Sequence, residues 1–351
     1  TESGMRITEL ENSELTYEKK HEFNVGIDLG FLKNRLNLAA DYYRRNNFDL
    51  IGVINTQGAG GTIAKYANIA SMKSSGIELT ISSKNMRTKD FSWNTDFIFS
   101  KTKNEITDLK SHANVLSLIS GNGFGREGYP VRGLFSIPFA GLTEDGLPTF
   151  INQDGQKTIS SFNFQEYEKL DFLKYEGPTD PTITGSFGNI LTYKNLKLNV
   201  FVTYSFGNVI RLDPVFSNAY SDLDAMPKEF KNRWMKAGDE NVTNIPTIVS
   251  TRMNQQYAYL NMAYNAYNYS DVRIADGGFI RLKEISLSYD LPAKVINFFR
   301  LNKLQLKLQA TNLCLLYADS KLNGQDPEFF RSGGVSTPVP KQFTFTVRLG
   351  L

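Results

Sequence analysis

A strict two-residue alternation of apolar and polar side chains dominates the last part of the chain, Gly278–Leu351. In Leu304–Thr311 every even position is apolar and every odd position is polar, and Phe343–Leu351 repeats this pattern. Only a pleated strand converts a period of two into two separate faces. Phe279–Tyr289 shows the same alternation but changes phase near Lys283, which predicts a β-bulge at that point. These segments are expected to be strands with one apolar and one polar face.

Six further segments carry the same alternation and occur in pairs separated by only a few residues. They are residues 23–30, 36–43, 77–82, 91–100, 187–193 and 196–206. Short links between alternating segments predict tight hairpins. Within the long stretch 102–184, Gly141–Phe150 is expected to form a small hairpin that turns at Asp145-Gly146. The sequence therefore predicts about nine antiparallel strands, most of them near the nine to eleven residues that a tilted strand needs to cross a bilayer.

Short and long connections between these strands alternate strictly along the chain. The stretches 44–76, 102–184, 207–278 and 314–342 are long and irregular, whereas the other links are short. Ala293–Phe299, in one of the short links, is expected to form a helical turn or two. Outer-membrane β-barrels have short periplasmic turns and long outer loops, and a soluble sandwich has little reason for this one-sidedness. The connections favour a membrane barrel.

The side chains of the predicted strands are compatible with this interpretation. Polar residues within a strand would cost several kcal/mol each if they faced lipid, so they are expected to face a wet lumen. These residues are Asp28, Asn37, Asp41, Glu78, Asn94, Asp96, Lys197, Asn199, Lys307 and Arg348. Aromatic residues near strand ends fit either interfacial girdles or, equally well, the core of a soluble sheet. They are Tyr42, Tyr43, Phe91, Trp93, Tyr193, Tyr204, Phe206 and Tyr289.

Composition excludes several other classes of protein. The formal net charge is only +3, without a dense basic run, which argues against a nucleic-acid partner. Cys314 is the single cysteine, so the chain has no internal disulfide, and it is expected to be a small apolar residue just past a strand. Together with His21 and His112 it cannot assemble a metal site from soft ligands. No nucleophile or cofactor motif is present, so we expect neither a catalytic site nor a cofactor.

The number and direction of the predicted strands suggest a piece of a larger barrel. The first and the last of the nine predicted strands both run toward the short-turn side. A closed bacterial barrel normally has an even number of strands, with both chain ends periplasmic. At least one strand is therefore expected to lie outside these 351 residues.

Several motifs resemble one known family in their order and spacing. They begin with Leu15-Thr16-Tyr17-Glu18 and Phe23–Gly30, and end with Phe279–Tyr289 followed by Leu291-Pro292 and with Gly324–Glu328. This series resembles the C-terminal portion of SusC/RagA-type TonB-dependent transporters of the Bacteroidetes outer membrane. The resemblance runs from about residue 15 to the end of the chain.

The resemblance implies a fold and a function. The intact protein is expected to be an all-β, multi-pass outer-membrane barrel of about 22 antiparallel strands, of which residues 1–351 supply the C-terminal part, without the plug domain and the N-terminal strands. It would import oligosaccharides or peptides by TonB-dependent active transport, with a SusD-like lipoprotein acting as a lid. The implied partners are this lipoprotein, TonB acting through the N-terminal region, the substrate and outer-membrane lipid. No enzyme activity is implied.

One aromatic and amide-rich stretch within 207–278 is the candidate contact site for substrate or lid. It offers flat aromatic faces for sugar rings and amides for hydroxyl groups, although packing against neighbouring loops or the lid is the commoner role for tyrosine in such a segment. Its residues are Tyr257, Tyr259, Asn261, Tyr264, Asn265, Tyr267, Asn268 and Tyr269. Asp145, Asp154 and the trio 326–328 could hold calcium, but carboxylates are common in turns for local reasons.

Two functions from other classes remain open at this point. One is a passive porin or adhesin barrel, which the odd number of strands disfavours. The other is a soluble β-sandwich that binds carbohydrate, which the one-sided loops disfavour.

Overall fold

A nine-stranded antiparallel sheet forms the main body of the computed structural model, which describes residues 12–55, 64–215, 227–257, 260–298, 301–330 and 338–350. The strands follow one another in chain order across the sheet, so that each one pairs with the next. They are β1 (Lys19–Phe31), β2 (Leu36–Asn55), β3 (Ala64–Arg87), β4 (Phe91–Leu109), β10 (Ile183–Tyr193), β11 (Leu196–Phe206), β14 (Phe279–Asp290), β15 (Lys303–Ala318) and β16 (Gln342–Gly350).

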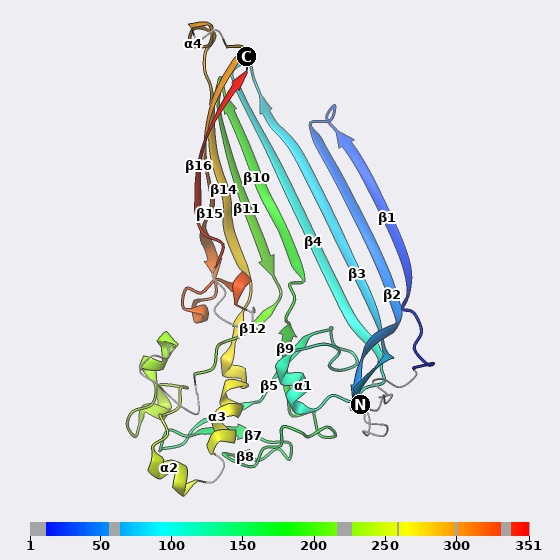
Figure 1. Ribbon diagram of the computed structural model, residues 1–351, viewed down its shortest axis with the longest axis vertical. Coiled ribbons are helices and arrows are strands. Elements are labelled where there is room, and N and C mark those ends of the chain that lie inside the picture. The colour runs from blue at the N-terminus through cyan, green and yellow to red at the C-terminus, as the bar shows by residue number, and fades with distance from the viewer. Residues whose placement is uncertain are drawn as a thin grey trace, which may run out of the picture.

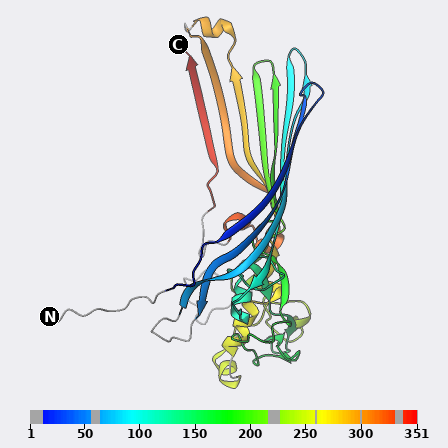
Figure 2. The same cartoon turned by 90° about the vertical axis from the view of Figure 1, so that its right-hand side faces the viewer.

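The two ends of this sheet differ in the connections that they carry. Figure 1 shows the short turns, the helix α4 (Ala293–Phe298) and the C-terminus at one end, and the long loops at the other. Figure 2 shows that the sheet curves strongly along its strands. The predicted long connections within 102–184, 207–278 and 314–342 are confirmed, as is the helical turn in 293–299. The strict alternation is wrong at one point, because only residues 56–63 separate β2 from β3, fewer than the residues 291–302 that separate β14 from β15. Across the described ranges, none of the helices is both long and apolar enough to cross a membrane.

All nine predicted strands are present, but several are longer than predicted. β2 has 20 residues, β3 has 24 and β4 has 19. The stretch 44–76, predicted to be irregular, contains the second half of β2 and the first half of β3. The pairing of β2 with β3 shifts register between Asn47 and Ile51, next to Asp49 with φ of 55°. This irregularity interrupts the two-residue period while the ladder continues, which is why the alternation alone ended both strands too early.

The predicted bulge lies at Lys283. Phe201 of β11 pairs with Glu284, while the next residue, Val202, pairs with Leu282. Lys283 therefore has no pairing residue on β11. The extra residue moves the apolar set back to the correct face of β14. Cys314, in contrast, lies within β15 rather than past its end, and it is exposed.

The register separates the sheet into one polar and one apolar face. Asp41 pairs with Glu78 and Gln305 pairs with Arg348, and the remaining polar residues predicted to face a lumen fall on this same face. The opposite face carries large exposed apolar side chains, such as Leu308 at 58% exposure. Tyr43 is expected from the sequence to lie either in an aromatic girdle at a strand end or in the core of a soluble sheet, and it lies in neither. It lies on the polar face, where its ring covers Gly76 and its hydroxyl lies 3.1 Å from Oγ1 of Thr102.

The long loops contain small secondary structure elements. Between β4 and β10 lie α1 (Val115–Ser120), β5 (Gly133–Ser136), β6 (Phe139–Leu142), β7 (Pro148–Ile151), β8 (Lys157–Thr158) and β9 (Lys174–Pro178). Between β11 and β14 lie β12 (Val209–Arg211), η2 (Lys228–Asn232), η3 (Asp239–Asn241), α2 (Thr251–Gln256), α3 (Leu260–Asn268), η4 (Asp271–Arg273) and β13 (Ile274–Asp276). After β15 follow η5 (Ser320–Leu322) and η6 (Pro327–Phe329).

The loops 110–182 and 207–278 pack together into one outer-loop domain. Phe135 and Phe150 from the first loop and Leu260, Tyr264 and Tyr267 from the second belong to the same buried cluster. The predicted hairpin at Asp145-Gly146 is present as β6 and β7, with Gly146 at φ of 76°. Figure 1 shows the elements of both loops intermingled beyond the end of the sheet. The domain therefore has a hydrophobic core of its own.

Candidate functional site

Arg211 of β12 ties the two loops of the outer-loop domain together from inside. Its guanidinium donates hydrogen bonds to the carbonyl oxygens of Phe135 at 2.6 Å and Ile119 at 3.3 Å in the first loop, and of Ser270 at 3.2 Å in the second. The ring of Tyr269 lies 5.4 Å from the guanidinium. Burial lowers the pKa of Arg211 to about 10, and it remains charged at neutral pH. Its contacts therefore fix one loop against the other.

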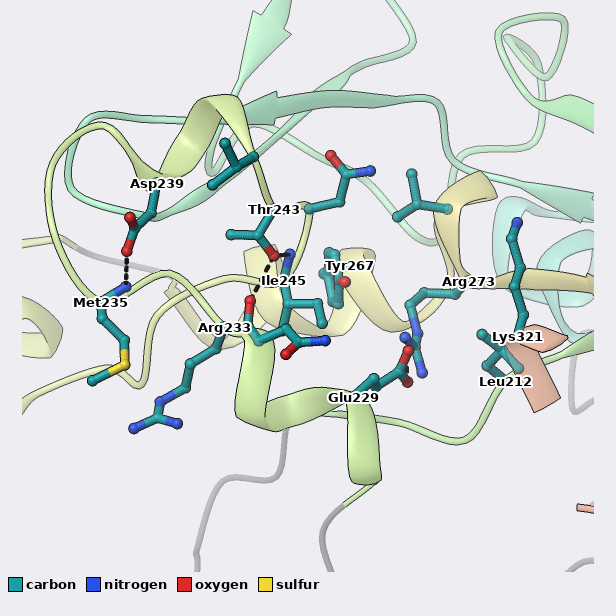
Figure 3. Close-up of a pocket in the computed structure, with 14 residues that line it drawn as sticks. Leu212, Glu229, Arg233, Met235, Asp239, Thr243, Ile245, Tyr267, Arg273 and Lys321 are labelled. Carbon is teal, nitrogen blue, oxygen red and sulfur yellow. Dashed lines mark hydrogen bonds and ion pairs between the residues drawn. The ribbon is translucent and has the colours of Figure 1, made fainter. Parts of the chain in front are cut away.

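A recess of about 550 Å³ opens beside this junction. It is lined mainly by the loop 207–278, with Lys321 added from the last loop. Tyr267, Leu212 and Ile245 contribute apolar surface, and Thr243 and Asp239 contribute polar groups (Figure 3). A volume of this size falls in the range of small-molecule sites.

Arg273 and Glu229 form an ion pair within the recess. Nη1 of Arg273 lies 2.7 Å from Oε1 of Glu229, and the Arg273 side chain is only 2% exposed. Arg273 also donates to the carbonyl oxygen of Asp213 at 2.6 Å, and its guanidinium lies 5.8 Å from the ring of Tyr267. Burial raises the pKa of Tyr267 to about 12, so this hydroxyl stays protonated. Figure 3 shows the two charged groups side by side.

Within the described part of the chain, the other two cations of the recess have no carboxylate partner. Among the described residues, Arg233 hydrogen-bonds only the carbonyl oxygen of Phe230, at 3.5 Å, and Lys321 Nζ donates to that of Ile274, at 3.0 Å. Asp239 instead accepts hydrogen bonds from the backbone of Met235 and of residue 236, both at 3.1 Å. The lining thus carries three cationic and two carboxylate side chains, and the two cations without a carboxylate partner can accept an anionic or polar group carried on an apolar body.

The structure distributes the predicted contact residues between the core and the surface. Tyr264, Tyr267 and Asn268 are buried at 2%, 1% and 8% exposure, and Tyr267 also lines the recess. These residues serve the packing role that was the alternative interpretation. Asn261 and Asn265 are exposed on α3, one turn apart. Tyr257 and Tyr269 are partly buried, and Tyr259 lies outside the described residues.

The carboxylates considered for calcium have other partners here. Asp326 accepts hydrogen bonds from Arg281 at 2.6 and 2.7 Å, and Glu328 lies 3.1 Å from the same guanidinium. Asp154 pairs with Lys169 at 2.6 Å. Within the described ranges, no group of three or more histidine, cysteine, aspartate or glutamate side chains could hold a metal ion.

Sequence reasoning missed the charged residues of the recess. Glu229, Arg233 and Arg273 come from separate parts of one loop and have no periodic spacing. The sequence gives little indication that Arg273, in an irregular stretch next to Ile274, is buried. A buried arginine needs a charged or polar partner, and the sequence alone does not identify that partner. Their proximity depends on the fold of the whole outer-loop domain.

Comparison with known sequences finds relatives that cover nearly all of this chain. TonB-dependent receptor P3 of Formosa agariphila is 26% identical over 349 residues, which span 93% of this chain and 32% of that protein. TonB-dependent receptor SusC of Bacteroides thetaiotaomicron is 26% identical over 360 residues, which span 97% of this chain and 32% of SusC. The chain thus spans about a third of the length of these relatives. No family model matches it.

Solved structures share the same fold. A structure of the RagAB peptide transporter superposes with a TM-score of 0.75 at 24% identity, covering 99% of this chain and 37% of the other. A structure of the RagAB peptide importer in the open-open state gives a TM-score of 0.71 at 22% identity, covering 97% and 35%. The sheet and the outer-loop domain together are therefore an arrangement already known from solved proteins.

Proposed function

We propose that this chain, which is a C-terminal portion of a SusC/RagA-family TonB-dependent outer-membrane transporter, forms one wall and the outer-loop domain of a nutrient importer. The intact protein would take up oligosaccharides or peptides by TonB-dependent active transport. A SusD-like surface lipoprotein would cover the outer-loop domain as a lid. The chain itself carries out no covalent chemistry in this proposal.

The observation that supports the proposal best is that a sheet with one polar and one apolar face carries the folded outer-loop domain at its long-loop end. The polar face suits a water-filled or plugged lumen and the apolar face suits lipid. The outer-loop domain has its own core, so it presents a preformed surface rather than separate mobile loops. A preformed surface is what a reversible lid requires, since little order has to be gained on closing.

Two surfaces of the outer-loop domain are the candidate contacts. The exposed amides of Asn261 and Asn265 on α3 can hydrogen-bond hydroxyl or peptide groups. The recess around Arg233 and Lys321 can accept a carboxylate or another polar group. Tyr257 and Tyr269 are partly accessible and are proposed to contribute ring edges. We assign substrate or lid contact to these residues, and a packing role to Tyr264 and Tyr267.

The experiment that tests the function is purification of the full-length protein from its native outer membrane in detergent. Intact mass and peptide mapping of the co-purifying proteins should identify a lipoprotein lid and a transporter polypeptide about three times as long as this chain, because the chain spans 32% of its relatives. Uptake of labelled oligosaccharides and of labelled peptides by cells should then depend on the transporter and on TonB.

The outcomes separate the alternatives. Uptake that persists after TonB is removed would indicate a passive porin, and a monodisperse protein of this chain's 39.6 kDa that needs no detergent would indicate a soluble sandwich. Asn261→Ala/Asn265→Ala should reduce uptake or lid binding. Asn163→Ala, an exposed-loop amide of the first loop that we do not place at either surface, serves as the matched control.

A further inference from the structure

Basic side chains gather on the apolar face of the sheet at its long-loop end. They are Arg44 on β2, Lys73 on β3, and Lys101 and Lys103 on β4, and all four are exposed. Strand register places them on this face, because Arg44 pairs with Ser75 and Ser75 pairs with Lys103. Tyr42 and Ile77, two residues away along β2 and β3, lie on the same face.

The register also gives the shape of this cluster. Arg44, Ser75 and Lys103 form one row across three strands, and neighbouring strands lie roughly 4.8 Å apart. Lys73 follows on the same face of β3, roughly 6.8 Å farther along the strand. Ser75 is therefore surrounded by three cationic side chains, which can converge on one group above its hydroxyl. Lys101 lies in the next row toward the middle of the sheet, paired with Ile77.

The charges of the cluster are only partly compensated. Glu105 on β4 lies 2.8 Å from Nζ of Lys73 and 3.7 Å from Nζ of Lys103. Among the described residues, neither Arg44 nor Lys101 forms an ion pair. Within the described ranges, Glu105 thus pairs with two of the four cations, and the other two have no ion-pair partner.

The position of the cluster relative to apolar side chains indicates its ligand. In the row of Lys101, the neighbouring strands carry the apolar side chains Val25, Tyr42 and Ile77, which are 53%, 43% and 51% exposed. Exposed apolar side chains bordered by cationic ones match a lipid, with acyl chains against the first and an anionic headgroup against the second. In β11 and β14–β16 the basic residues of the wall, Lys197, Lys307 and Arg348 among them, lie instead on the polar face.

We propose that Arg44, Lys73, Lys101 and Lys103 hold the phosphate group of an anionic glycolipid in the outer leaflet of the outer membrane. Arg44 provides planar paired donors for phosphate oxygens, and the three lysines act as point charges. Ser75 supplies a neutral donor at the centre. The proposal rests on the outer-membrane location of the chain, and it is independent of which nutrient is imported.

The test measures glycolipid binding to the full-length transporter, purified in detergent and stripped of lipid. The probe is purified lipid A, the phosphorylated glycolipid anchor of lipopolysaccharide, and bound lipid is counted by native mass spectrometry. Arg44→Gln/Lys103→Gln should weaken binding by more than tenfold, since a basic residue near an anionic surface contributes about fivefold. The matched control, Lys89→Gln/Lys194→Gln, removes two charges at the short-turn end and should leave binding unchanged.

Two further arms separate a lipid site from a site for free phosphate. Dephosphorylated lipid A should bind as weakly to the wild type as intact lipid A binds to the double variant. Inorganic phosphate alone should compete only at concentrations far above those of the lipid. Equal binding of lipid A by the wild type and the double variant would overturn the proposal, and so would equal affinity for lipid A and inorganic phosphate. Both variants are first checked for heat-modifiable migration on gels, which reports a folded barrel.

Discussion

Arg281 on β14 and Asp326 in the last outer loop form a two-oxygen ion pair that is almost fully shielded from solvent. Nη2 of Arg281 lies 2.6 and 2.7 Å from the two carboxylate oxygens of Asp326, and the side chains are 6% and 9% exposed. Oε2 of Glu328 also lies 3.1 Å from Nη2 of Arg281, but the Glu328 side chain is 46% exposed. The loop after β15 is thus attached to the polar face of the sheet.

Loss of the Asp326 carboxylate is expected to release this loop. Asp326→Asn leaves the buried guanidinium of Arg281 without its main counter-charge, and breaking such a pair costs about 3–5 kcal/mol. Amide hydrogen exchange should accelerate in 319–330 while exchange in β14 stays slow. Glu328→Gln, which removes the exposed partner, is the control and should have an effect of about 1 kcal/mol or less. Equal exchange in both variants would contradict this role of Asp326.

Tyr43 requires a glycine at position 76. A Cβ added to Gly76 would lie 2.5 Å from ring atoms of Tyr43, whereas at Gly188 the nearest atom would be 3.4 Å away, on Phe201. We expect Gly76→Ala to destabilise the barrel by about 1–3 kcal/mol through overpacking, and Gly188→Ala to be tolerated. The temperature at which the full-length protein loses heat-modifiable migration on gels measures the difference. If the two alanine variants unfold at the same temperature, the ring of Tyr43 is free to move aside and this prediction is wrong.

The assignment of the two faces predicts opposite effects for neighbouring positions of β15. Leu308→Arg places a charge on the apolar face, where an arginine near the middle of the bilayer costs about 2–4 kcal/mol. Gln309→Arg places the same charge on the polar face and should cost little. Reversible unfolding of the full-length barrel from lipid vesicles in urea or guanidinium gives both free energies. The assignment fails if Gln309→Arg is the more destabilising change.

The pKa of Glu176 predicts a pH dependence of the outer-loop domain. Burial raises the pKa of this carboxyl above its usual value, with a partial opposing effect from Lys174, whose Nζ lies 3.5 Å away. The folded state therefore binds the proton more tightly than the unfolded state. The contribution of Glu176 to stability is greatest below its unfolded pKa and declines as pH rises through the folded pKa.

Glu176→Gln should accordingly raise the melting temperature of the outer-loop domain at pH 7.5 and have little effect near pH 4. Amide hydrogen exchange of β5–β9 and α3, followed with temperature in the full-length protein, reports on this domain separately from the sheet. Glu144→Gln, at an exposed turn of the same domain, is the control and should change neither value. A lower melting temperature of Glu176→Gln at both pH values would show that the charge of Glu176 is stabilising instead.

Much of the wall could be predicted from the sequence, because a period of two is a local signal. The phase change in Phe279–Tyr289 located the bulge at Lys283, and the phase of each strand assigned its polar residues to one face. The ends of β2 and β3 could not be predicted, because the register shift beside Asp49 breaks the period without ending the ladder. Tyr43 fits the pattern of a strand-end aromatic, because the sequence does not show that its ring will cover Gly76.

The outer-loop domain was much less predictable, for a physical reason. Tyr264 and Tyr267 lie in a segment whose composition suits a binding surface, yet the loop 110–182 covers them, and this contact is non-local. The hairpin at Asp145-Gly146 was predictable because turn chemistry is local. The pairing of Arg273 with Glu229 joins two distant points of the same loop, and only the assembled domain brings them together.

The shared core of the loops 110–182 and 207–278 also bears on how the wall assembles. The two loops flank the hairpin of β10 and β11 on either side, so contact between them brings the outer ends of β4, β10, β11 and β14 close together. Closing a long loop has an entropic cost that is reduced once its own residues are already packed. The outer-loop domain thus holds the outer ends of four strands in alignment. Substitutions that disrupt its core are therefore expected to impair insertion of the barrel into the membrane before any other property.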